Sequence, residues 1–158
     1  MVMGPNLPSV LYNAMIHPLV PYSIKGAIWY QGESNVGRAE QYSRLFPKMI
    51  NDWRSHWKTD FPFYFVQIAP YNYGTPPNKE GSMDLRDAQR KSLKTKNTGM
   101  VVTMDIGNFM NIHSANKQDV GSRLAGLALK NDYNNKIVAS GPLYKKHTIS
   151  GNKLILQF

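Results

Sequence analysis

Three short apolar segments alternate with longer amphipathic stretches along the chain. The segments lie at residues 26–30, 63–68 and 100–104 and are rich in aromatic and branched side chains, which favour buried strands. Because helical stretches separate them, we expect the strands to form one parallel sheet joined by crossover helices. The pattern therefore predicts an α/β fold.

The stretches around the strands have the spacing of helices. We expect helices over residues 8–17, between Tyr42 and Trp57, over 84–95 and over 117–130. Pro47 lies inside the second stretch, and because proline lacks the N–H of a helical hydrogen bond, we expect one helix to end and another to begin near it. Ser82 or Asp84 is expected to cap the third helix, and Asn116 the fourth.

The last segment of the chain has a different pattern. Residues 147–156 alternate between polar and apolar side chains around the turn sequence Ser150-Gly151-Asn152, which is typical of a β-hairpin. We therefore expect a first domain over residues 1–139 and the start of a following β region over 140–158.

Composition narrows the class of protein. With 158 residues, 42% of them hydrophobic, the chain can form one domain with a core and is not of the disordered type. No stretch approaches the roughly 18 consecutive apolar residues of a membrane span, so we expect no membrane partner. The absence of cysteine excludes disulfides and thiolate–zinc sites. We expect neither metal nor cofactor. The compartment stays open, and a periplasmic or secreted parent protein is among the options.

The net charge of +9 raises the question of a nucleic-acid partner. The basic residues are spread along the chain, most of them on the polar faces of expected helices; they include Arg44, Lys48, Arg54, Lys58, Arg86, Arg90, Lys91, Lys94, Lys96, Lys145 and Lys146. No nucleic-acid-binding motif accompanies them, so solvated helix faces explain them better than a phosphate-binding stripe. We expect no nucleic-acid partner.

Two polar segments follow expected strands and are candidates for chemistry. The first strand runs into Gln31-Gly32-Glu33-Ser34-Asn35, and the third into Asp105 and a loop that carries His113. Ligands of open α/β sheets bind at the carboxyl ends of the strands, and in a parallel sheet both loops can face one crevice. The alternative is a pair of ordinary solvated turns.

These segments resemble a known family. Ile28-Trp29-Tyr30-Gln31-Gly32-Glu33-Ser34-Asn35 and the run from Asn111-Ile112-His113 to Arg123-Leu124-Ala125 are similar to the sialate O-acetylesterases, which belong to the SGNH branch of the GDSL-type esterases. Further similar segments are Leu7–Asn13, Leu85–Gln89 and Ser140–Tyr144. The resemblance covers nearly the whole chain.

The resemblance implies a flavodoxin-like, three-layer α/β/α fold with a parallel sheet. It also implies removal of acetyl groups from sugar hydroxyls, typically on sialic acid or related glycans, by a serine nucleophile, a histidine base and an oxyanion hole. His113 matches the catalytic histidine of the family. The block that lines the oxyanion hole and acetyl pocket corresponds to Gln31, Gly32, Glu33, Ser34 and Asn35. Gln31 and Asn35 can both donate from an amide, and the sequence does not decide between them.

Two departures from the family pattern bear on the mechanism. Where many relatives have aspartate two residues before the histidine, this chain has Asn111, which can hold an imidazole but cannot stabilise its positive charge. Glu33, Asp105 or another acid then orients the histidine, or the site works as a dyad. The second departure concerns the nucleophile. In the family it lies in an amino-terminal Gly-x-Ser-Asn block, and nothing before Gly26 matches that block.

Ser34 follows a strand, but Val36 stands where a nucleophile elbow needs glycine. We therefore expect the serine to lie outside this chain, the first strands of the sheet to be missing, and the chain alone to be inactive. Without those strands, the apolar edge of residues 27–30 is expected to be bare and to drive self-association. A glycan-binding relative without hydrolytic activity and a basic nucleic-acid-binding module are the alternatives.

Overall fold

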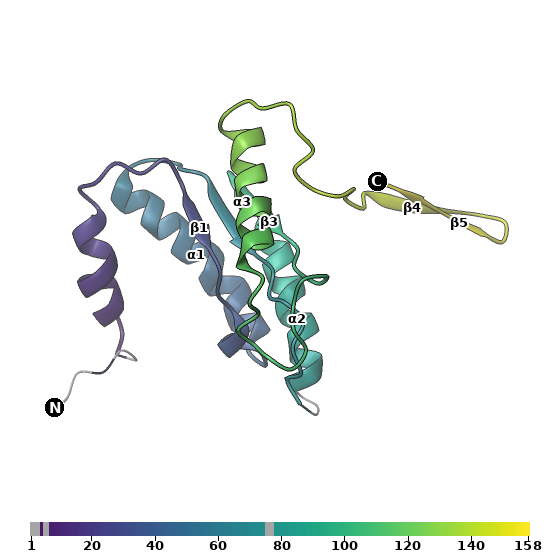
Figure 1. The fold of residues 1–158 in the computed structure, drawn as a ribbon, viewed down its shortest axis with the longest axis horizontal. Coiled ribbons are helices and arrows are strands. Elements are labelled where there is room, and N and C mark those ends of the chain that lie inside the picture. Colours follow the sequence, from purple (N-terminus) through teal and green to yellow (C-terminus); the bar gives the residue numbers. More distant parts are fainter. Residues whose placement is uncertain (1–3, 5–6, 75–77) are drawn as a thin grey trace.

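A computed structural model describes residue 4 and residues 7–74 and 78–158. Its main sheet has three parallel strands in the order β1 (Ala27–Trp29), β2 (Phe63–Val66) and β3 (Thr98–Val101) (Figure 1). The predicted parallel α/β sheet is confirmed, although the third strand begins two residues earlier than the apolar run. No helix in the described part of the chain is long and apolar enough to cross a membrane.

Helices cover both faces of this sheet. They are α1 (Ala39–Trp57), α2 (Asn78–Lys91) and α3 (Lys117–Asn131), with shorter helical turns at Tyr12–Ile16, His17–Leu19, Glu33–Asn35 and Ser92–Lys94. Phe63 and Phe65 of β2 pack in one core cluster with α1 and α2, whereas Tyr64 and Val66 pack with α3 on the other face. All four side chains of β2 are buried for this reason. The three-layer α/β/α arrangement is confirmed.

The expected break at Pro47 is wrong, because α1 runs through this residue as one helix. Its apolar stripe is buried on both sides of the proline, by Tyr42 and Phe46 before it and Ile50 after it. Burial of each such side chain stabilises by roughly 1.5–3 kcal/mol. The sum exceeds the roughly 3 kcal/mol that an internal proline costs, so packing against the sheet keeps the helix continuous.

The predicted caps have mixed outcomes. Asn116 does cap α3, and its side chain accepts a hydrogen bond from the backbone nitrogen of Asp119 at 3.2 Å. Ser82 and Asp84 are not caps, because α2 begins at Asn78 and includes both. Arg86 donates to the hydroxyl of Ser82 one turn away, at 3.4 Å, which gives this polar side chain a partner within the helix.

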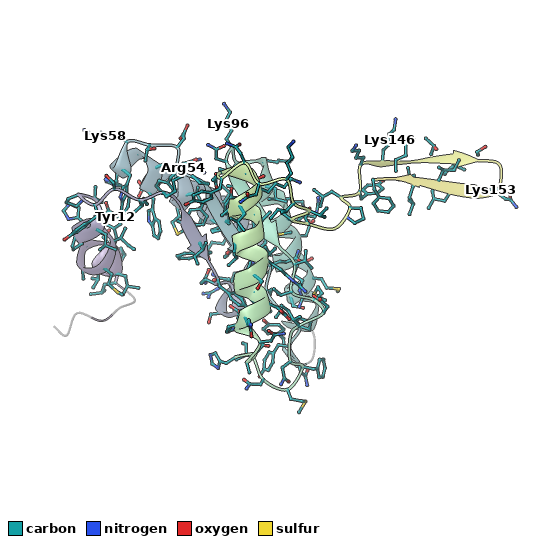
Figure 2. All side chains as sticks on the ribbon, turned by 45° about the horizontal axis from the view of Figure 1, so that its top comes forward. Tyr12, Arg54, Lys58, Lys96, Lys146 and Lys153 are labelled. Carbon is teal, nitrogen blue, oxygen red and sulfur yellow. The ribbon has the colours of Figure 1, made fainter. Side chains whose placement is uncertain are left out.

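A buried arginine joins α1 to the amino ends of β2 and β3. The guanidinium of Arg54 donates to the carbonyls of Phe61 (3.0 and 2.8 Å), Lys96 (2.9 Å) and Asn97 (2.9 Å). Only 5% of Arg54 is exposed, so its expected place on a solvated helix face is wrong. Figure 2 shows Arg54 and Lys96 together at this end of the molecule.

The predicted hairpin is confirmed as β4 (Lys146–Ser150) paired antiparallel with β5 (Lys153–Gln157). Every residue of both strands is exposed, and the hairpin extends away from the α/β body (Figures 1 and 2). The domain boundary near residue 139 stays a prediction. At the other side, β1 pairs only with β2 among the described residues, and Ile28 is 70% exposed. Self-association through this edge likewise stays a prediction.

Candidate active site

The carboxyl ends of the three parallel strands lie at the same edge of the sheet, where α1, α2 and α3 begin (Figure 1). The loops that follow β2 and β3 pack together. The backbone nitrogen of Asn72, after β2, donates to the carbonyl of Phe109, after β3, at 2.9 Å. Gly107 lies so close to Pro70 that no side chain would fit there. The structure therefore places the Gln31–Asn35 turn and the loop of His113 at one edge.

Gly32 sets the course of the turn after β1. It is buried, and its φ of 149° is rarely adopted by residues with a side chain. A Cβ at this position would lie 3.0 Å from Gln89 Nε2 and 3.0 Å from Ile68 Cγ2. The chain can thus turn tightly against α2 and the end of β2 only because this residue is glycine.

The two amides of the turn have different roles. The Gln31 side-chain nitrogen donates to the Asn35 side-chain oxygen at 2.6 Å, and both residues are half-buried. An amide nitrogen carries two hydrogens, so Gln31 keeps one that this bond does not use. The bond holds the two amides together, and each keeps a hydrogen that could be donated to a ligand.

Ser34 and Glu33 lie in the short helical turn that follows Gly32. Ser34 is exposed, and its carbonyl accepts from Arg38 at 2.7 Å; no described residue contacts its hydroxyl as a base would. Glu33 is half-buried beside a group of tyrosines. Burial, followed by the negative charge of Glu33, raises the pKa of Tyr73 to about 12. Within the described chain, the Glu33 carboxylate makes no hydrogen bond or ion pair.

His113 is exposed on the loop before α3. Its backbone nitrogen donates to the side-chain oxygen of Asn111 at 2.9 Å, and Ser114 anchors the loop by donating to the carbonyl of Ile106 at 2.9 Å. Asn111 thus shapes the backbone of the loop, and no described residue makes a hydrogen bond, ion pair or ring-stacking contact with the His113 ring. The start of α3 also contacts the residue that follows β1. The Lys117 ammonium lies 4.5 Å from the centre of the Tyr30 ring.

Beside that contact, a groove of about 320 Å³ runs between β1 and α3, lined by Ile28, Trp29, Tyr30, Lys117, Val120, Gly121 and Leu124. The groove extends to Tyr30, which directly precedes Gln31, and to Lys117, the first residue of α3. His113 and the Gln31–Asn35 turn do not line it.

Asp105 is engaged in an ion pair with Arg123 of α3. The two guanidinium nitrogens lie 2.7 and 2.6 Å from the two carboxylate oxygens, and Arg123 also donates to the carbonyl of Val102. Hydrogen bonding to Arg123 lowers the pKa of Asp105 to about 2. This pair secures the start of the His113 loop, so Asp105 is not available to the imidazole.

We expect the Arg123→Gln variant to raise the pKa of Asp105 from about 2 toward its ordinary value of 3.8. Because the folded-state pKa is depressed, the pair stabilises the folded chain above about pH 4, and this contribution is lost as the pH falls toward 2. An NMR titration of the Asp105 carboxyl carbon measures the shift. A midpoint that stays near 2 in the variant would contradict the assignment.

Sequence reasoning missed the contribution of α2. Arg86 donates to the carbonyls of Ile68 (3.0 Å) and Ala69 (3.1 Å), and Gln89 lies fully buried beneath the turn. The two residues are three positions apart, which puts them on one face of the helix. Their spacing lies inside the family-like segment Leu85–Gln89, and it was the sequence signal that could have indicated a shared role for the two residues.

Comparison with known proteins identifies the family. Residues 6–130 match the family model described as carbohydrate esterase, sialic acid-specific acetylesterase. The mouse sialate O-acetylesterase is 39% identical over 92% of this chain, and the human one is 36% identical over 98%. The chain spans 30% and 33% of the length of these two relatives.

A solved structure shows the same relationship in three dimensions. A carbohydrate acetylesterase from Xanthomonas citri superposes with a TM-score of 0.87 at 42% identity, over 95% of this chain and 36% of its own. This agreement extends to the layered sheet that positions the two candidate segments. The chain belongs to the carbohydrate esterase family of sialic acid-specific acetylesterases.

Proposed function

We propose that this chain is the histidine-bearing part of a carbohydrate O-acetylesterase, a carboxylic ester hydrolase that removes acetyl groups from sugar hydroxyls. O-acetylated sialic acid or a related glycan is the proposed substrate. One observation carries the proposal: in a chain of this family, His113 and the Gln31–Asn35 turn follow strands at the same edge of the sheet.

The proposed chemistry is acyl transfer in two steps. His113 takes the proton from a serine hydroxyl outside this chain, and the serine oxygen attacks the acetyl carbonyl. The unused N–H of the Gln31 amide donates to the oxyanion that forms. His113 then gives the proton to the departing sugar oxygen. A water molecule attacks the acetyl-enzyme in the same way, and acetate leaves.

Glu33 is the proposed partner of His113. Of the three candidates, Asp105 is bound to Arg123 and Asn111 to the backbone of the histidine, whereas the Glu33 carboxylate has no such partner in the described chain. A carboxylate that reaches His113 in the complete active site would stabilise the imidazolium that forms during each proton transfer. Glu33 is thus the acid best able to support the base.

A chimera tests this function. This chain would replace the matching segment of the Xanthomonas citri carbohydrate acetylesterase, which covers 36% of that protein. We expect the chimera to release acetate from O-acetylated sialic acid, measured by an enzyme-coupled acetate assay. A folded chimera that binds the sugar but releases no acetate would contradict the proposal and favour the glycan-binding alternative.

The chain alone is expected to behave differently. Without a serine for His113 to deprotonate, it should hydrolyse 4-nitrophenyl acetate no faster than its His113→Ala variant. A rate that depends on His113, together with a burst of acetyl-enzyme on Ser34, would show instead that Ser34 is the nucleophile.

A further inference from the structure

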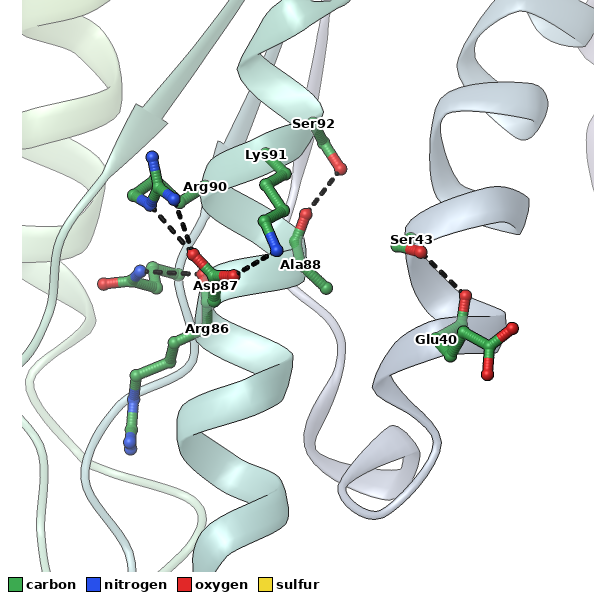
Figure 3. Close-up of polar contacts among 9 residues, drawn as sticks. Glu40, Ser43, Arg86, Asp87, Ala88, Arg90, Lys91 and Ser92 are labelled. Carbon is green, nitrogen blue, oxygen red and sulfur yellow. Dashed lines mark hydrogen bonds and ion pairs between the residues drawn. The ribbon is translucent and has the colours of Figure 1, made fainter.

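The two faces of α2 make different contacts. On the outer face, Asp87 accepts from Arg90 at 2.6 and 3.0 Å and pairs with Lys91 at 2.6 Å, in contacts open to solvent (Figure 3). On the inner face, Gln89 has no exposed surface. A buried amide must find partners for its oxygen and both hydrogens, because leaving each of them unmet costs about 1–3 kcal/mol.

Gln89 meets this requirement by joining the ends of two strands. Its side-chain oxygen accepts from the backbone nitrogen of Ile68 at 2.9 Å. Its side-chain nitrogen donates to the carbonyl of Val66 at 3.2 Å and to the carbonyl of Gln31 at 3.3 Å. Val66 ends β2 and Gln31 opens the turn after β1, so one side chain joins the ends of both strands. The Tyr42 hydroxyl also donates to the Gln31 carbonyl, at 3.4 Å, but it does not contact the end of β2.

The bond to Gln31 also sets the direction of the next backbone group. In a trans peptide, the carbonyl of one residue and the N–H of the next point in opposite directions. Since the Gln31 carbonyl points toward α2, the Gly32 N–H points away from α2. Gly32 rests directly on the Gln89 amide, where a Cβ would lie 3.0 Å from its nitrogen. The turn therefore has little freedom to rotate.

We infer that Gln89 is a positioning residue, which orients the Gly32 N–H and the neighbouring Gln31 amide toward the acetyl group in the acyl-transfer step. The inference rests on the proposed function of the turn. Gln89 itself does not touch the substrate and acts through the Gln31 carbonyl. A misplacement of about 1 Å in such donors can lower the rate about 10²-fold. Loss of the bond between Gln89 and the Gln31 carbonyl is therefore expected to slow acyl transfer.

Gln89→Glu separates positioning from general core support. Glutamate has nearly the same shape and keeps an oxygen for the Ile68 N–H. Its carboxyl group has one hydrogen when protonated and none when ionised, so it cannot donate to both Gln31 and Val66 as the amide does. Gln89→Met removes all three bonds without burying a charge. The matched control is Ser92→Ala, because Ser92 is also buried and donates to Ala88 at 2.9 Å, away from the turn (Figure 3).

The chimera provides two independent readouts. Hydrogen–deuterium exchange should be at least tenfold faster over residues 31–35 in Gln89→Glu, with residues 98–101 of β3 unchanged. In the same variant, kcat for acetate release should fall about 10²-fold with little change in KM. Ser92→Ala should change neither quantity.

Three results would overturn the inference: exchange over 31–35 as slow as in the unmodified chimera, equal acceleration in β3, or global unfolding of both Gln89 variants. The exchange measurement does not depend on catalysis. An unmodified chimera without esterase activity would therefore refute the proposed function while still testing the role of Gln89.

Discussion

Replacing His113 by alanine in the chimera is expected to lower kcat for O-acetylated sialic acid by about 10²–10⁴-fold, the usual contribution of a general base. The imidazole is the proposed proton acceptor at this edge of the sheet, whereas Asn111 and Ser114 secure its loop through bonds to the backbone. KM should change little, because the proton moves in the transition state. Steady-state acetate release measures both quantities.

His56→Ala is the matched control for this experiment. His56 is an exposed histidine on α1, 3.7 Å from Asp52, and has no place in the proposed mechanism. We expect its removal to leave kcat unchanged. Equal rates for the His113 and His56 variants would show that His113 is not the base.

Arg54→Met is expected to lower the free energy of unfolding by about 2–4 kcal/mol. The buried carbonyl of Phe61 loses its donors, which costs about 1–3 kcal/mol, and the half-buried carbonyls of Lys96 and Asn97 each lose one donor at a smaller cost. The carbonyls of Phe61, Lys96 and Asn97 would be affected together. Chemical denaturation of the chain, followed by tryptophan fluorescence, measures the change.

Arg44→Met provides the comparison on the same helix. Arg44 is exposed and lies 3.7 Å from Glu40, an ion pair of the kind that contributes about 0–1 kcal/mol. We expect a change within about 0.5 kcal/mol for this variant. Similar losses for both arginines would show that the carbonyl contacts of Arg54 do not hold the sheet together.

The strands and the common edge of the two candidate segments could be predicted from sequence for one reason. Apolar runs separated by helices imply a parallel sheet, and a parallel sheet brings the residues that follow its strands together. This argument alone is enough to place Gln31 and His113 at one edge of the sheet. The hairpin over 146–157 was equally visible, because its alternation is local.

The remaining features depend on contacts between distant parts of the chain. Arg54 has the spacing of a solvated residue, yet it binds carbonyls up to 43 positions away. Gln89 bonds to a carbonyl 58 positions away, and its spacing from Arg86 indicates a shared helix face but not this distant partner. Pro47 stays within α1 because the helix packs against the sheet, and helix propensities do not include such tertiary contacts.

The most direct test of the account is a crystal structure of the chimera after reaction with a phosphonate ester, which traps a serine nucleophile as a mimic of the tetrahedral intermediate. We expect a phosphonyl oxygen about 2.7–3.1 Å from the Gln31 side-chain nitrogen or the Gly32 nitrogen. We also expect the His113 ring within hydrogen-bond reach of the serine oxygen. A trapped serine whose phosphonyl oxygen is held only by groups outside this chain, with His113 turned to solvent, would contradict it.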